Sequence, residues 1–84
     1  MQVSADEMLS RRQERANAEQ VLAQLSLDKR AVFVMFEIDE LSCDEIASIV
    51  GVPLGTVYSR LHAARAAFKA ALARYQAASA RRER

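Results

Sequence analysis

The fold is decided by residues 41–57, which read LSCDEIASIVGVPLGTV. Ser42 is a suitable N-cap, and Glu45 stands three residues later, where its carboxylate completes a capping box. Leu41 and Ile46 flank this box and can pack on one another as a hydrophobic staple. This local pattern predicts that a helix begins at residue 43.

The same stretch predicts a helix-turn-helix: a short helix over residues 43–50, a tight turn, and a longer helix from residue 54. Gly51 can take the positive φ that ends the short helix at little energetic cost. Ala47 is small enough for the second helix to cross close by, and Val57 is a branched apolar residue that packs it back on the first. An ordinary corner between two bundle helices would use the same residue types and is the alternative.

The rest of the chain is also predicted to be helical, because its 84 residues include many alanines but only two glycines and one proline. We expect an all-α fold of four helices over residues 5–24, 27–38, 43–50 and 54–78. Residues 1–15 are interpreted as a helical or partly disordered lead-in. Residues 16–76 then form the domain, and residues 77–84 form a frayed basic tail.

Apolar periodicity predicts the core. At the end of the first helix and just after it, the residues expected to be buried are Val21, Leu22 and Leu25. The second helix is apolar almost all round over residues 31–38, as in the central element of a small bundle. The last helix carries an apolar stripe with steps of three and four residues: Leu54, Val57, Leu61, Ala64, Phe68, Leu72 and Tyr75.

Composition excludes several classes of protein. One cysteine and one histidine provide neither an intramolecular disulfide nor a metal site. The chain has no glycine-rich phosphate loop and no convergent set of polar residues, so we predict neither an enzyme nor a cofactor. The N-terminus does not resemble a secretory signal, and the longest apolar run, residues 31–36, is far below the ~20 residues of a membrane span. We expect a cytoplasmic protein.

The net charge of +1 conceals a strong segregation of charge along the chain. Residues 1–50 carry five Lys and Arg against ten Asp and Glu, whereas residues 51–84 carry seven against one. This distribution favours a polyanionic partner for the C-terminal third. A solvated helix with a basic tail is the alternative.

One side of the last helix is suited to the DNA major groove. At 100° per residue, the positions opposite the apolar stripe are Gly55, Ser59, His62, Ala63 and Ala66, with Thr56, Tyr58 and Arg60 beside them. Nearly all of these are small or able to hydrogen-bond. Val52 and Pro53 offer no side-chain cap, so we expect the free N–H groups of Leu54, Gly55 and Thr56 to bind a DNA phosphate.

Residues 41–47 and the run Gly51-Val52-Pro53-Leu54-Gly55-Thr56-Val57-Tyr58-Ser59-Arg60-Leu61-His62-Ala63-Ala64-Arg65 closely resemble region 4 of extracytoplasmic-function sigma factors. These are small sigma-70-type subunits of bacterial RNA polymerase, and the resemblance covers residues 16–72. It implies promoter −35 recognition during transcription initiation. Base contacts are then expected from Tyr58, Ser59, His62 and Ala63, and backbone contacts from Thr56 and Arg60. Arg65, at the end of the run, is counted with the DNA-binding residues.

The resemblance also implies protein partners, namely the flap of the RNA polymerase β subunit and an anti-sigma factor. A module whose main partner is a protein, or a stand-alone helix-turn-helix regulator, is the alternative to promoter recognition. Sigma factors of this type carry a second domain that nothing here matches. The resemblance therefore implies that the chain is the C-terminal portion of a longer factor, with residues 1–15 derived from the interdomain linker. The family often has basic residues where this chain has Tyr58 and Ala63, so its −35 preference is expected to differ.

Four assignments have a second interpretation. Arg60 either contacts DNA or pairs with Glu45, and Tyr58 either contacts DNA or packs over the edge of the bundle. Cys43 is a half-buried filler rather than a redox group, because Asp44 and Glu45 oppose a lowered thiol pKa. The acidic stretch that begins at Glu37 is either a solvated helix end or a rim for a protein partner.

Overall fold

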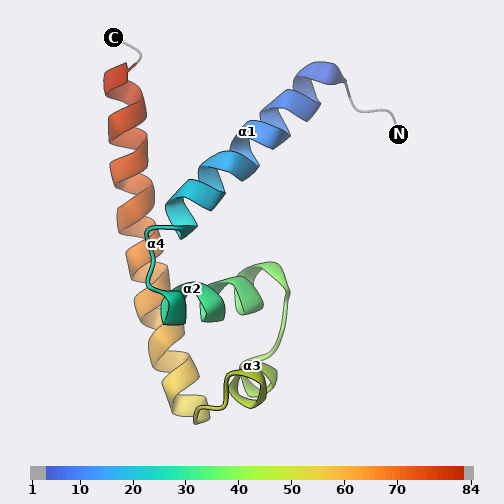
Figure 1. Cartoon of the computed structure of the whole chain (residues 1–84), viewed down its shortest axis with the longest axis vertical. Coiled ribbons are helices and arrows are strands. Elements are labelled where there is room, and N and C mark those ends of the chain that lie inside the picture. Colours follow the sequence, from blue (N-terminus) through green and yellow to red (C-terminus); the bar gives the residue numbers. More distant parts are fainter. Residues whose placement is uncertain (1–3, 83–84) are drawn as a thin grey trace.

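The computed structural model describes residues 4–82, and every regular element in that range is helical. In chain order these are α1 (Ala5–Leu22), α2 (Leu27–Phe33), the π-helical turn η1 (Val34–Ile38), α3 (Cys43–Val50) and α4 (Leu54–Arg82). Figure 1 shows α4 as a long rod, with α3 beside its N-terminal end, α2 crossing its lower half and α1 leaving it near its middle. The predicted all-α fold is confirmed.

The helix bounds differ from the prediction in three places. The first helix ends at Leu22 rather than residue 24, because the chain turns there to bring Leu25 into the core. The predicted helix over residues 27–38 is α-helical only to Phe33 and continues as the π-helical η1. The last helix continues to Arg82, so the predicted frayed tail is helical as far as the structure describes it, in keeping with the high helix propensity of its alanines.

Two clusters of buried apolar side chains hold the helices together, and α4 contributes to both. The first cluster joins α2, α3 and α4 and consists of Val32, Ile46, Val57 and Leu61. The second joins α1 and the following turn to α4 and consists of Val21, Leu25, Ala64 and Ala71. Every residue of the predicted α4 stripe is buried or half-buried. Leu22, predicted to be buried, is only half-buried.

The second helix is less enclosed than its composition predicts. Only Val32 of α2 and η1 is fully buried, and Ile38 is 58% exposed. Phe33 stacks on Phe68 of α4, with ring centroids 4.7 Å apart and an interplanar angle of 20°. The helices described over residues 4–82 are too few to cover both sides of α2, so one side of this apolar segment remains at the surface.

Helix α1 extends from the body of the domain as an arm (Figure 1). The Cα radius of gyration is 15.6 Å, against about 12 Å for a compact domain of this length. Near its C-terminal end the arm is held by polar contacts as well as by the second cluster. The hydroxyl of Tyr75 donates to Oδ1 of Asn17 at 2.5 Å, and Nη2 of Arg74 donates to Oε1 of Gln24 at 3.2 Å. Within residues 4–82, no helix is both long and apolar enough to cross a membrane.

Candidate nucleic-acid interface

The start of α3 is fixed by the predicted capping box. The Glu45 N–H donates to Oγ of Ser42, and the Ser42 N–H donates to Oε1 of Glu45, both at 3.1 Å. Donation to the Glu45 carboxylate by the Ser42 backbone N–H, and to a smaller extent by the Ser42 hydroxyl, lowers the pKa of Glu45 below its ordinary value. Leu41 is half-buried against the first cluster, which contains Ile46, in keeping with the predicted staple. The sequence therefore fixes this helix end locally.

The turn after α3 depends on Gly51, whose φ of 77° lies in the left-handed region. The carbonyl oxygen of Ala47 accepts hydrogen bonds from the N–H groups of Gly51, at 2.9 Å, and Val52, at 3.2 Å. These two bonds satisfy one end carbonyl of α3 and reverse the chain within a few residues. The predicted helix over 43–50 and its glycine turn are confirmed.

The angle between α3 and α4 is set by apolar contacts on their inner sides. Ile46 and Val57 are both 0% exposed, and they pack with Leu61 and with Val32 of α2. Ala47 is half-buried against the same cluster. The small residue, the glycine and the branched residue thus occupy the three roles that the sequence assigned to them, and together they build a helix-turn-helix.

The N-terminus of α4 only partly matches the expected phosphate site. The carbonyl oxygen of Pro53 accepts from the N–H groups of Thr56, at 3.0 Å, and Val57, at 3.2 Å. The expectation that the Thr56 N–H is free is therefore wrong, because the first turn folds back on Pro53. The N–H groups of Leu54 and Gly55 have no partner among the residues that the structure describes.

The predicted DNA-facing side of α4 does point away from the core. Gly55, Tyr58, Ser59 and His62 are exposed, while Leu54, Thr56, Arg60 and Ala63 are half-buried. Tyr58 is 56% exposed, so it does not pack over the edge of the bundle. The exposed side chains come from successive turns of one helix and form a single strip, which we call the α4 strip, defined by Gly55, Tyr58, Ser59 and His62.

The chain matches the family described as Sigma-70, region 4, over residues 15–68, well over half of its length. It belongs to that family. Sigma-70 region 4 is a DNA-binding part of sigma factors with a role in promoter −35 recognition. The matched residues run from the C-terminal half of α1 to the middle of α4, and so contain the helix-turn-helix and most of both core clusters.

In this region 4 domain the possible Glu45–Arg60 pair does not form, and Arg65 has a partner that sequence reasoning did not assign. Glu45 uses its carboxylate in the α3 capping box, and within residues 4–82 the structure contains no ion pair between Glu45 and Arg60. Arg65, by contrast, is paired with Glu37 of η1: its Nε and its Nη2 both lie 2.8 Å from Oε1. These two residues are 28 positions apart, and no local signal in the sequence connects them.

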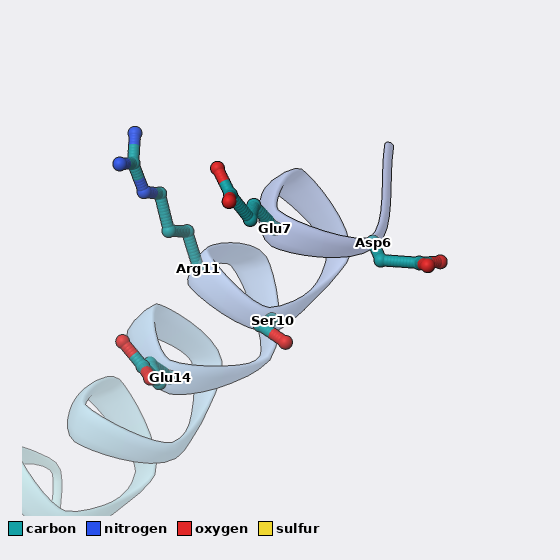
Figure 2. Close-up of a pocket in the computed structure, with 5 residues that line it drawn as sticks. All are labelled: Asp6, Glu7, Ser10, Arg11 and Glu14. Atoms are coloured by element: carbon teal, nitrogen blue, oxygen red, sulfur yellow. The ribbon is translucent and has the colours of Figure 1, made fainter. Parts of the chain in front are cut away.

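Other features of this region 4 domain do not form a second site. Cys43 is half-buried against the first cluster, as expected of a filler. In the described part of the chain, no three His, Cys, Asp or Glu residues gather around a potential metal position. Figure 2 shows a shallow hollow on α1 lined by Asp6, Glu7, Ser10, Arg11 and Glu14, in which Asp6 points away from Glu7 and Arg11. These side chains do not converge, so the α4 strip remains the candidate site.

Proposed function

We propose that this sigma-70 region 4 domain binds the promoter −35 element by placing the N-terminal half of α4 in the DNA major groove. The observation that carries the proposal is the exposure of Gly55, Ser59 and His62 directly opposite the buried Val57 and Leu61. A helix held on one side by a core and lined on the other by small or hydrogen-bonding residues fits a groove about 12 Å wide.

The residues of the α4 strip suggest how bases are read. The Ser59 hydroxyl can both donate and accept a hydrogen bond. The His62 imidazole can donate a hydrogen bond to purine N7 or to a neighbouring acceptor on the base edge. The ring of Tyr58 and the methyl group of Ala63 suit the C5-methyl group of thymine. With no arginine or lysine at positions 58 and 63, this set favours hydrogen-bonding and apolar contacts over bidentate contacts to guanine.

We assign contacts with the DNA backbone, and the electrostatic attraction of DNA, to residues beside the α4 strip. Thr56 and Arg60 lie beside it and can reach phosphates, as can the N–H groups of Leu54 and Gly55 at the helix N-terminus. Helix α4 carries six Lys and Arg and no acidic residue. Such a helix attracts a polyanion over a distance and makes binding sensitive to salt.

To test the assignment of base and phosphate contacts, the domain is first used to select a duplex from a random-sequence pool. Binding of the labelled duplex is then measured by fluorescence anisotropy. His62→Ala should lose about 1–3 kcal/mol of discrimination between the selected and a scrambled duplex, because a base contact is removed. Arg60→Gln should weaken binding to both duplexes and reduce the salt slope by about 0.9, because a phosphate contact is removed.

Arg11→Gln on the α1 arm is the matched control, because it makes the same change in charge at an exposed residue far from the strip. It should leave discrimination and salt slope unchanged. If the wild-type domain binds both duplexes equally at all salt concentrations, or if Arg11→Gln matches the effect of Arg60→Gln, the assignment is refuted.

The exposed apolar side of α2 and η1 supports a second role, in docking on the RNA polymerase β flap. A shallow groove of about 360 Å³ is lined by Leu27, Arg30, Ala31, Val34, Met35 and Asp39. Leu27 is 76% exposed, so a partner could cover it without unfolding the domain. Leu27→Asp should abolish co-elution with core RNA polymerase and leave DNA binding intact, whereas Leu9→Asp on the arm, which is also at an exposed leucine, should change neither.

We infer further that the chain belongs to the extracytoplasmic-function subgroup and that an anti-sigma protein is a second partner. Such a protein would prevent DNA binding by covering the α4 strip. The prediction is that a captured anti-sigma protein competes with the labelled duplex and that His62→Ala weakens both interactions. Binding of both ligands at once would contradict this shared surface.

A further inference from the structure

The Glu37–Arg65 pair fixes one guanidinium group on two sides. Nε and Nη2 of Arg65 both lie 2.8 Å from the same oxygen, Oε1 of Glu37. The Cζ atom of Arg65 also lies 5.2 Å from the centroid of the Phe36 ring, within the range of a cation–π contact. A carboxylate and an aromatic face thus both restrict the orientation of the Arg65 side chain.

The π-helical turn η1 makes this double contact. Its last turn closes with the Asp39 N–H donating to the Val34 carbonyl at 3.0 Å and the Leu41 N–H donating to the Met35 carbonyl at 2.9 Å. This wider turn carries Phe36 and Glu37, the consecutive residues that both reach Arg65. Such turns are rare and often occur at functional sites.

Arg65 is still available to another anion. Its side chain is 52% exposed, and its Nη1 group has no partner among residues 4–82. At 100° per residue Arg65 lies within 60° of His62 and about one turn further along α4, so it continues the α4 strip toward its C-terminal end. An arginine at the margin of the α4 strip is well placed to bind a phosphate next to the bases that the strip contacts.

We propose that Glu37 is a positioning residue, which orients Arg65 so that its free Nη1 group meets a DNA phosphate. The proposal rests on the proposed function, since it assumes that the α4 strip lies in the major groove. Glu37 itself touches no DNA in this arrangement. Its role is to hold Arg65 before DNA arrives.

Glu37 has two opposing effects on DNA affinity, and their magnitudes decide whether it raises or lowers that affinity. Immobilising a free arginine side chain weakens an association by up to about thirtyfold, and pre-orientation by Glu37 avoids part of that loss. Repulsion between the Glu37 carboxylate and a phosphate about 7 Å away weakens binding by at most about fivefold at physiological ionic strength. Pre-orientation therefore dominates, and Glu37 increases affinity for DNA.

The test measures DNA affinity and its salt slope for Glu37→Ala, Arg65→Ala and the double variant, with the duplex selected from the random pool. Glu37→Ala is expected to weaken binding by about three- to tenfold with the salt slope unchanged, because Arg65 still neutralises its phosphate. Arg65→Ala is expected to weaken binding and to reduce the slope by about 0.9. The double variant should bind no more weakly than Arg65→Ala, because Glu37 acts only through Arg65.

Asp39→Ala is the matched control, because it removes one exposed negative charge two residues away without touching Arg65. It should strengthen binding slightly. Thermal unfolding of each variant checks the fold, and Glu37→Gln, which keeps the size of the side chain, provides a second variant if Glu37→Ala unfolds.

Two results would overturn the proposal. If Glu37→Ala strengthens binding and steepens the salt slope, Glu37 withholds Arg65 from DNA rather than presenting it. If Arg65→Ala leaves the slope unchanged, the pair is structural only. Both differ from failure of the proposed function, in which the wild-type domain itself shows no salt-sensitive binding to the duplex.

Discussion

Replacing Gly55 with alanine separates stability of the domain from DNA binding. Gly55 lies in the first turn of α4, its φ is not positive, and a Cβ atom added there has nothing within 4 Å. Glycine is about 0.5–1 kcal/mol less favourable than alanine within a helix. Because the site is sterically open, we expect Gly55→Ala to stabilise the domain by about 0.5 kcal/mol. For a domain of this size that raises the midpoint of thermal unfolding by roughly 2–4 °C.

The same methyl group should weaken DNA binding. The Gly55 N–H has no partner among the described residues, and the residue begins the α4 strip, where the backbone can approach a phosphate closely. A Cβ atom at this position increases the distance of closest approach. We expect about a fivefold to tenfold loss of affinity, that is, about 1–1.4 kcal/mol, for specific and scrambled duplexes alike, since a phosphate contact carries no sequence information.

Gly51→Ala is the comparison, because it is the same chemical change four residues earlier. An added Cβ also meets nothing within 4 Å there, but the φ of 77° is unfavourable for any residue with a Cβ atom. We expect destabilisation by about 1–2 kcal/mol from the backbone alone. The affinity of the fraction that remains folded should be close to that of the wild type.

Stability is measured by circular dichroism during thermal unfolding. DNA affinity is measured by anisotropy titrations at a temperature where both variants are folded. For Gly55→Ala we expect stability to rise and DNA affinity to fall. The expectations for the two variants are refuted if Gly55→Ala binds the duplexes as tightly as the wild type, since the backbone at Gly55 would then be remote from DNA. They are equally refuted if Gly51→Ala is as stable as the wild type.

Four further changes probe the supports of the fold. Glu40 has a φ of 58°, so Glu40→Gly should raise the free energy of unfolding in urea by about 0.5–1 kcal/mol. Ser42→Ala removes the α3 cap and should lower that free energy by about 1 kcal/mol. The pKa of Glu45 is lowered from its ordinary value of 4.5 in the folded state, so this carboxylate stabilises the fold at pH values above 4.5. That stability is lost as the pH falls through the folded-state pKa. Glu45→Gln should therefore make the free energy of unfolding less dependent on pH in this acid range. Tyr75→Phe removes the bond to Asn17 and should cost about 1 kcal/mol, with faster amide hydrogen exchange confined to α1.

The parts of the fold that could be predicted from sequence depend on residues close together in the chain. The Ser42–Glu45 box and the turn at Gly51 each involve groups within five residues, and backbone geometry alone brings such groups into contact. The exposed side of α4 was predictable for the same reason, because helical periodicity fixes where His62 lies once Val57 is buried.

The features that sequence reasoning missed depend on how separate elements meet. The Glu37–Arg65 pair requires η1 to lie against the middle of α4, and neither residue differs in type from a solvated surface charge. Ala71 is fully buried, yet it looks like any other alanine of an alanine-rich helix. The change from α to π geometry after Phe33 occurs within an unbroken apolar run, so periodicity gives no sign of it.

The orientation of the α4 strip depends on core residues that touch no DNA in the proposed arrangement. Helix α3 has only eight residues, too few to be stable alone, so its position against α4 is set by packing rather than by its own helicity. That packing brings together Ile46, Val57 and Leu61 with Val32, which comes from α2. The second cluster, by contrast, attaches the α1 arm further along α4. The orientation of the α4 strip is therefore governed by α2 and α3, and the arm can vary in sequence without altering the surface assigned to DNA.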